Sequence, residues 1–134
     1  MAAIMDIEGI GEQSAAKLTA AGVSTVEALL EKAGPSAGRE ALAAATGLDK
    51  GSLLAWVNRA DLMRVKGVGS EFSDLLEAAG IDSVPELGQR RADNLHAKLV
   101  EVNDAKKLTR RTPNLEEVTR WVDEAKSMPA AVTH

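Results

Sequence analysis

The sequence has no cysteine and no tyrosine, and its only aromatic residues are two tryptophans and one phenylalanine among 134 residues. Without cysteine the chain forms no disulfide, thiolate metal site, iron–sulfur cluster or thiol nucleophile, which favours a reducing, cytoplasmic setting. Because aromatics are scarce, the core must consist of small and branched aliphatic side chains, and this favours helices over sheets. The same scarcity argues against a base-stacking groove for single-stranded nucleic acid.

Long apolar segments and a strong excess of one charge are also missing. The apolar runs are only a few residues long, and the first residues lack the basic flank and apolar length of an export signal. We therefore expect a soluble, non-secreted chain with no membrane segment. Sixteen basic and twenty acidic side chains give a net charge of −4, which argues against coating nucleic acid by bulk charge but leaves a local basic face open.

Groups that support catalysis or metal binding are sparse as well. Neither His96 nor His134 has a partner at metal-ligand spacing. No carboxylate cluster, Ser–His pair or phosphate-binding glycine-rich loop with a trailing lysine is visible. The expectation is a protein that is not an enzyme, with no cofactor, no metal and no small-molecule substrate.

An internal repeat is the strongest positive feature of the sequence. Residues 7–29 and 65–87 align with a shift of 58, and eight of 23 positions are identical, among them three glycines in phase. Further on, Trp56 matches Trp121 at a shift of 65, so the second copy contains an insertion of seven residues. Both tryptophans lie on amphipathic segments and are expected to be core anchors. The repeat predicts two tandem modules, 1–60 and 61–127, followed by a flexible tail, 128–134.

The pattern of apolar residues, caps and glycines predicts an all-α fold, with the two modules packed as one compact unit. Expected helix starts are Ser24 with Glu27, Asp82 with Pro85, and Asn114 with Glu117. Expected stops are Gly22, Gly47, Gly80 and Asn103. The expected helices span residues 12–21, 25–33, 36–46, 50–60, 70–79, 83–90, 93–102 and 115–127.

Each copy contains two glycines around one aliphatic residue, immediately before an expected helix. We call these the first glycine turn, formed by Gly9, Ile10 and Gly11, and the second glycine turn, formed by Gly67, Val68 and Gly69. Glycine permits positive φ and close approach of another backbone or a ligand. The free N–H groups of the following helix would then face outward and suit an anion such as a phosphate.

These turns resemble the helix-hairpin-helix family, whose pattern is met by Ile7, the first glycine turn, Ala15 and Leu18, and by their counterparts in the second copy. The segments after the turns are similar to the C-terminal domain of the bacterial RNA polymerase alpha subunit. Nearly the whole chain resembles an uncharacterised bacterial family of tandem hairpin proteins, a domain of unknown function. The resemblance implies two tandem helix-hairpin-helix (SAM-like) modules and sequence-independent binding of duplex DNA through backbone N–H groups of the turns and Ser70.

The surrounding charges differ between the two turns. The first is flanked by Asp6, Glu8 and Glu12, whose carboxylates repel phosphate. The second is better supplied with cations, because Arg59, Arg64 and Lys66 precede it. Residues 88–111 also carry seven basic against three acidic side chains, a run that supports salt-sensitive attachment to a polyanion. The basic candidates in this run are Arg90, Arg91, Lys107, Arg110 and Arg111.

The glycine turns and the basic run also have simpler structural interpretations. The glycine turns can be purely structural, and the basic run can be a solvated helical face. The leading functional hypothesis is a non-enzymatic module that binds duplex DNA or another polyanion through the second glycine turn and residues 90–111. The alternative is a protein-interaction or scaffold domain that has lost DNA binding and uses one face for a protein partner or for self-association.

Overall fold

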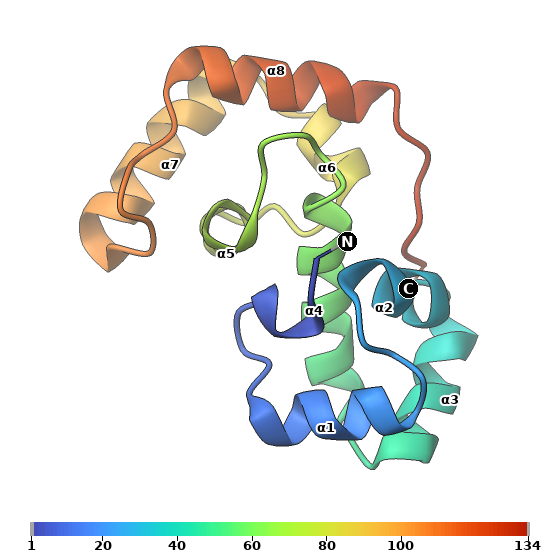
Figure 1. Ribbon diagram of the computed structural model, residues 1–134. Coiled ribbons are helices and arrows are strands. Elements are labelled where there is room, and N and C mark those ends of the chain that lie inside the picture. Colours follow the sequence, from blue (N-terminus) through green and yellow to red (C-terminus); the bar gives the residue numbers. More distant parts are fainter. Residues whose placement is uncertain (1, 134) are drawn as a thin grey trace. The chain divides into compact units, whose positions relative to one another are not determined.

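A computed structural model describes residues 2–133, and the regular secondary structure of these residues is helical apart from one isolated bridge between Ala3 and Thr25 (Figure 1). Met1 and His134 lie outside the described residues, so the sequence-based assignment of His134 to a flexible tail falls there. The elements in chain order are η1 (Ile4–Asp6), α1 (Glu12–Ala20), α2 (Val26–Ala33), α3 (Ser36–Thr46), α4 (Lys50–Leu62), α5 (Ser70–Ala78), α6 (Val84–Gly88), α7 (Ala92–Lys106) and α8 (Leu115–Lys126). The predicted all-α class is confirmed.

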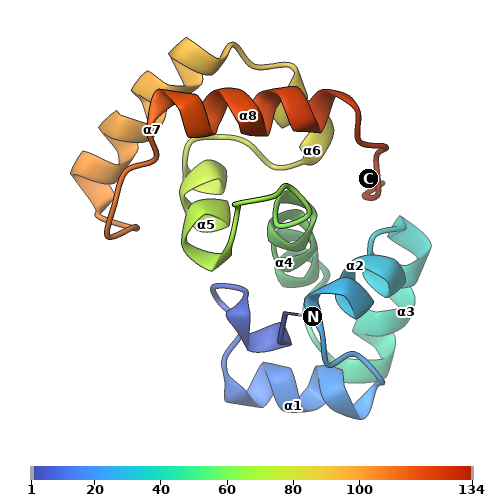
Figure 2. The ribbon, with the colours of Figure 1, turned by 45° about the horizontal axis from the view of Figure 1, so that its top comes forward.

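The chain forms two compact units. Among the described residues, one unit contains residues 2–61 together with 131–133, and the other contains Leu62–Ala130. In the second unit, α8 lies beside α6 and α7 (Figure 2). Its core consists mainly of buried aliphatic side chains between Leu62 and Ala125, together with Trp121, as the low aromatic content requires.

The two copies of the repeat have the same local backbone. Gly9 and Gly67 both have positive φ, at 95° and 91°, and so do Gly22 and Gly80, at 88° and 96°. The hydrogen bond from the Ala15 N–H to the Gly11 carbonyl (2.9 Å) recurs between Ser73 and Gly69, also at 2.9 Å. Helix α1 therefore begins after the first glycine turn just as α5 begins after the second.

Each glycine turn is packed against a tryptophan of its own unit. A Cβ atom on Gly9 would lie 3.1 Å from Trp56 Nε1, and one on Gly67 would lie 3.2 Å from Trp121 Nε1. Both tryptophans are buried, with 7% and 2% exposed. They are core anchors as predicted, and the indole ring occupies the space that a side chain on the glycine would need.

The structure corrects two of the predicted helix starts. Thr25, not Ser24, caps α2 by accepting from the Ala28 N–H at 3.0 Å. Ser83, not Asp82, caps α6 by accepting from the Glu86 N–H. In both cases a hydroxyl one residue later has the reach to the third amide of the helix. The capping box of Asn114 with Glu117 is confirmed at α8.

The predicted end of α7 at Asn103 is wrong. The helix continues to Lys106 and ends where Lys107 adopts a left-handed φ of 52°. Asn103 is buried instead, and its side chain hydrogen-bonds the following loop, accepting from the Thr109 N–H at 3.0 Å and donating to Thr112 Oγ1 at 3.0 Å. A side chain with good loop partners inside a helix does not act as a terminator.

The segment after α8 forms defined contacts at Thr133, within the residues predicted as a flexible tail. The Thr133 N–H donates to the Gly34 carbonyl at 3.0 Å, and its hydroxyl accepts from the Ser36 N–H at 2.9 Å. Arg39, only 6% exposed, donates to the carbonyls of Ala33, Gly34 and Thr133. This arginine clasp holds Ala131–Thr133 against the turn between α2 and α3.

The glycine turns give a matched pair of stability tests. We expect Gly67→Ala to lower the free energy of unfolding by about 1–2 kcal/mol, because φ is left-handed and the Cβ meets the Trp121 indole. Gly69 has an extended φ of −105° and no atom within 4 Å of a Cβ. Gly69→Ala should therefore change stability by less than about 1 kcal/mol. Equal effects in urea unfolding would contradict this account.

The arginine clasp predicts a cost for removing Arg39. We expect Arg39→Met to lower the free energy of unfolding by about 2–4 kcal/mol, because buried carbonyls lose their donor. Lys50→Met is the control, since Lys50 forms an exposed ion pair with Glu40 at 3.1 Å and its loss should cost less than about 1 kcal/mol. Thermal unfolding followed by circular dichroism measures both. A similar small loss in both variants would contradict a structural role for Arg39.

Candidate functional site

The second glycine turn opens onto a hollow at the start of α5. The hollow has a volume of about 510 Å³ and is lined by Gly67, Gly69, Ser70, Glu71, Phe72 and Arg110. No side chain caps the first turn of α5, whose N-cap is Gly69. Amides of an uncapped helix start, with an exposed arginine beside them, suit an anion. Glu71 opposes this, and its Oε1 lies 3.7 Å from Arg110 Nε.

A second, separate hollow also includes Gly67 in its lining. It has a volume of about 260 Å³ and is lined by Lys66, Gly67, Glu117, Arg120, Trp121 and Glu124. Glu124 Oε2 accepts a hydrogen bond from the Lys66 backbone N–H at 3.1 Å. The lining of this second hollow therefore combines cations with carboxylates.

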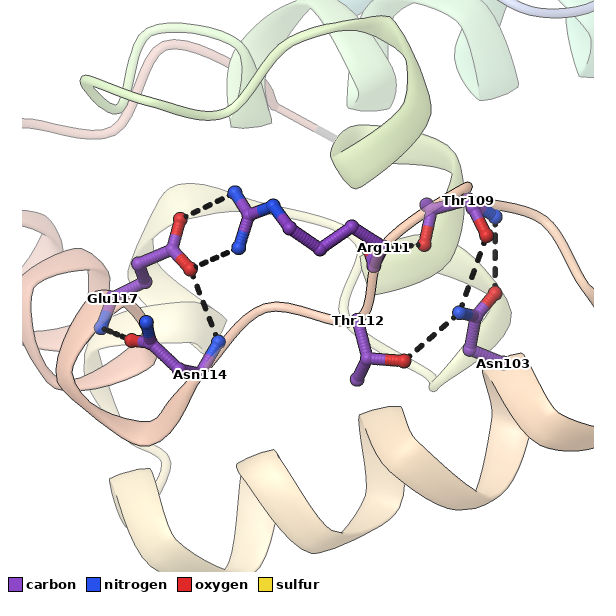
Figure 3. A network of polar contacts seen from close by, with 6 residues as sticks. All are labelled: Asn103, Thr109, Arg111, Thr112, Asn114 and Glu117. Atoms are coloured by element: carbon purple, nitrogen blue, oxygen red, sulfur yellow. Dashed lines mark hydrogen bonds and ion pairs between the residues drawn. The ribbon is translucent and has the colours of Figure 1, made fainter.

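Arg111 is part of a polar network (Figure 3). Its guanidinium forms two hydrogen bonds with the Glu117 carboxylate, at 2.5 and 2.9 Å, and lies 5.3 Å from the centre of the Phe72 ring. The hydrogen bonds from Arg111 lower the pKa of Glu117 to about 2, and the pKa of Arg111 is raised in turn. Arg111 thus joins α5 to the start of α8 and is already engaged within the protein.

The loop that carries Arg110 is held from its other side. Asn103 bonds Thr109 and Thr112, and the Thr109 hydroxyl donates to the Arg111 carbonyl at 2.7 Å (Figure 3). Both ends of the short loop between α7 and α8 are therefore fixed. Arg110 itself is 93% exposed at its side chain, so the network presents this arginine beside the second glycine turn.

Arg90 and Arg91 do not join this surface. They line a separate hollow of about 540 Å³, together with Leu115, Thr119 and Lys126 of α8. With 3.6 residues per turn, those three residues lie on the flank of α8 opposite to Glu117, Arg120 and Glu124. Arg90 pairs with Glu86 at 2.8 Å, and Arg91 pairs with Asp93 at 3.0 Å. The expected basic run is thus divided between two faces.

Arg64 and Lys107 contact backbone of their own unit. Arg64 Nη2 donates to the Pro129 carbonyl at 2.8 Å. Lys107 Nζ donates to the Asp104 carbonyl at 3.4 Å, and its left-handed backbone ends α7. Among the predicted cations, the structure brings Lys66 and Arg110 to the second glycine turn.

Arg59 differs from its predicted place. The sequence assigned it to the second glycine turn, but its Nη1 donates to the Glu8 carbonyl beside the first, at 2.7 Å. Its position on α4, three residues after Trp56, directs it to the turn that this tryptophan packs against. Sequence reasoning also missed Arg120 and Glu124. The alignment of Trp56 with Trp121 carried the signal, because the same shift aligns Arg59 with Glu124.

Between residues 2 and 133, no group of three or more histidine, aspartate or glutamate side chains is placed to hold a metal ion. In the same range no helix has the length and apolar character needed to cross a membrane.

These features define an all-helical protein built from a repeated glycine turn, each copy packed on a tryptophan and followed by a helix. A family model described as a domain of unknown function, DUF4332, matches residues 8–128. The chain belongs to this family. No curated protein and no solved structure matches it.

The Arg111–Glu117 pair predicts a pH dependence of stability. The Glu117 pKa is about 2 in the folded protein against a usual 4.5, so its stabilisation is full above about pH 4.5 and is lost as the pH falls towards 2. Glu117→Gln should be less stable than the wild type near neutral pH, and the difference should shrink across this window. Urea unfolding at several pH values tests this. A difference that is constant with pH would show that the ion pair contributes no stability.

Proposed function

We propose that this protein is a non-enzymatic binding module that contacts the phosphates of duplex DNA without reading its sequence. The observation that carries the proposal is the hollow at the start of α5, where an uncapped helix start lies beside Ser70 and the exposed Arg110. Backbone amides with a nearby arginine are a common way to hold phosphate oxygens. The helix-hairpin-helix resemblance of the repeated turns supports the same function.

The charges point to weak attachment. Lys66 and Arg110 are the predicted cations beside this turn, and Glu71 lines the same hollow as Arg110 with its Oε1 3.7 Å from Arg110 Nε. Neutralising about two phosphates gives a modest salt dependence, with a slope near −2 in a plot of log affinity against log salt. A single such site binds weakly. DNA or another polyanion that reached both flanks of α8 would gain further affinity from Arg90 and Arg91.

The first glycine turn contributes less in this proposal. Gly9, Ile10 and Gly11 have the same backbone as the second turn, but Glu8 and Glu12 are exposed beside them. Each carboxylate costs a bound phosphate an amount similar to the gain from one amide contact, about 1 kcal/mol.

A protein partner is the second candidate. The hollow on the opposite flank of α8 contains Leu115, which is 45% exposed, and charges of both signs, including Arg91, Asp123 and Lys126. An exposed apolar side chain among mixed charges suits a protein surface better than a polyanion. This face would serve a scaffold or interaction role.

A titration of labelled duplex DNA tests the proposal at low and moderate salt. We expect measurable binding at low salt that weakens at moderate salt, and about tenfold weaker binding for Lys66→Glu and for Arg110→Glu, because each reversal turns an attraction into a repulsion. Lys17→Glu, an exposed change of equal charge on α1, is the control and should have little effect.

Several outcomes would contradict this function. No binding at low salt would exclude DNA as the ligand. Equal losses in all three variants would show a net-charge effect with no defined site. Weaker binding in Lys17→Glu alone would move the site to the first unit. Melting temperatures of the variants show whether each one is folded.

A further inference from the structure

The two glycine turns carry opposite charges at equivalent positions. The shift of 65 that matches Trp56 with Trp121 also matches Arg59 with Glu124, and the shift of 58 matches Glu8 with Lys66. In each unit, therefore, the residue three positions after the tryptophan has the opposite charge from its counterpart, and so does the residue just before the turn.

The equivalent side chains bond the equivalent turn residue, but through opposite backbone groups. In the first unit, Arg59 Nη1 donates to the Glu8 carbonyl at 2.7 Å and lies 3.4 Å from the position of a Cβ on Gly9. In the second unit, Glu124 Oε2 accepts from the Lys66 N–H at 3.1 Å. A cation thus lies against the first turn and an anion against the second.

The charge of Glu124 is not balanced by an ion pair. Glu117 lines the same hollow, but both of its oxygens are bonded by Arg111. Within residues 2–133, no lysine or arginine side chain forms an ion pair with Glu124, whose bond is to a backbone amide. A carboxylate here has the charge and the acceptor atoms of a phosphate oxygen and already accepts from the Lys66 N–H, so it opposes a phosphate that approaches this turn.

We infer that Glu124 sets the ligand preference of the second glycine turn, by holding a negative charge against the Lys66 amide and so weakening the attachment of phosphate there. The inference rests on the proposed function, since it concerns the same turn. It assigns a role to the residue three positions after the tryptophan in each unit: an arginine at this position favours an anion, and a glutamate opposes one.

The variant Glu124→Gln isolates the charge. Glutamine keeps an oxygen that accepts from the Lys66 N–H but removes the negative charge. The matched control is Asp123→Asn, which removes the same charge from the preceding residue of α8. Asp123 is exposed, lies 4.0 Å from Lys126 and lines the hollow on the opposite flank. Both variants therefore change net charge equally and differ in their distance from the turn.

Titration of labelled duplex DNA at low salt should show about three- to tenfold tighter binding for Glu124→Gln than for wild type. Asp123→Asn should change the affinity less than about twofold. Glu124→Arg, which copies the residue of the first unit, should bind more tightly than Glu124→Gln and steepen the salt dependence by about one phosphate contact.

The outcomes separate this inference from the proposed function. Binding by the wild type that Glu124→Gln leaves unchanged overturns the inference alone. Equal gains in Glu124→Gln and Asp123→Asn overturn it too, because only net charge would then matter. If the wild type does not bind but Glu124→Gln and Glu124→Arg do, the inference holds and DNA binding by the natural chain fails. No binding by any variant overturns both.

Discussion

The close approach of a tryptophan indole to a left-handed glycine organises each unit. A Cβ on Gly9 would lie 3.1 Å from Trp56 Nε1, and one on Gly67 would lie 3.2 Å from Trp121 Nε1, which is tighter than usual contact. Both indoles are also buried in the core. The glycine has the same left-handed φ in both turns, and in both the helix begins directly after the second glycine. The exposed amides and the charges around the turn all take their positions from this contact.

The charges around this framework fall into two groups. Both Nη atoms of Arg111 donate to the two oxygens of Glu117, and its guanidinium lies over the Phe72 ring, so it acts as part of the fold. Exposed pairs such as Arg110 with Glu71, at 3.7 Å, are weak and exchange readily for another anion. Counting basic residues in one stretch of sequence therefore overestimates the positive charge at the surface, because acidic side chains on other helices neutralise part of it.

Local patterns predicted the helices and both glycine turns, because glycine spacing and cap residues act over a few residues. The choices of Ser24 over Thr25 and of Asp82 over Ser83 failed because adjacent residues offer similar acceptors. Asn103 was misread because its loop partners follow it by several residues. Arg59 lies beside the first glycine turn because its helix packs against that turn, and distance along the sequence does not reveal this tertiary contact.

The arginine clasp determines which part of the chain would resist a stretching force applied to its ends. Ala131–Thr133 is held by the first unit, and at the other end the Val26 N–H donates to the Ala2 carbonyl at 3.0 Å, so Ala2 is held by the same unit. A force applied through both ends of residues 2–133 is therefore resisted first by the α2–α3 turn and by the bridge at Val26. The second unit is inserted in the sequence between the two parts of the first unit. It therefore bears none of this force until one of these attachments breaks.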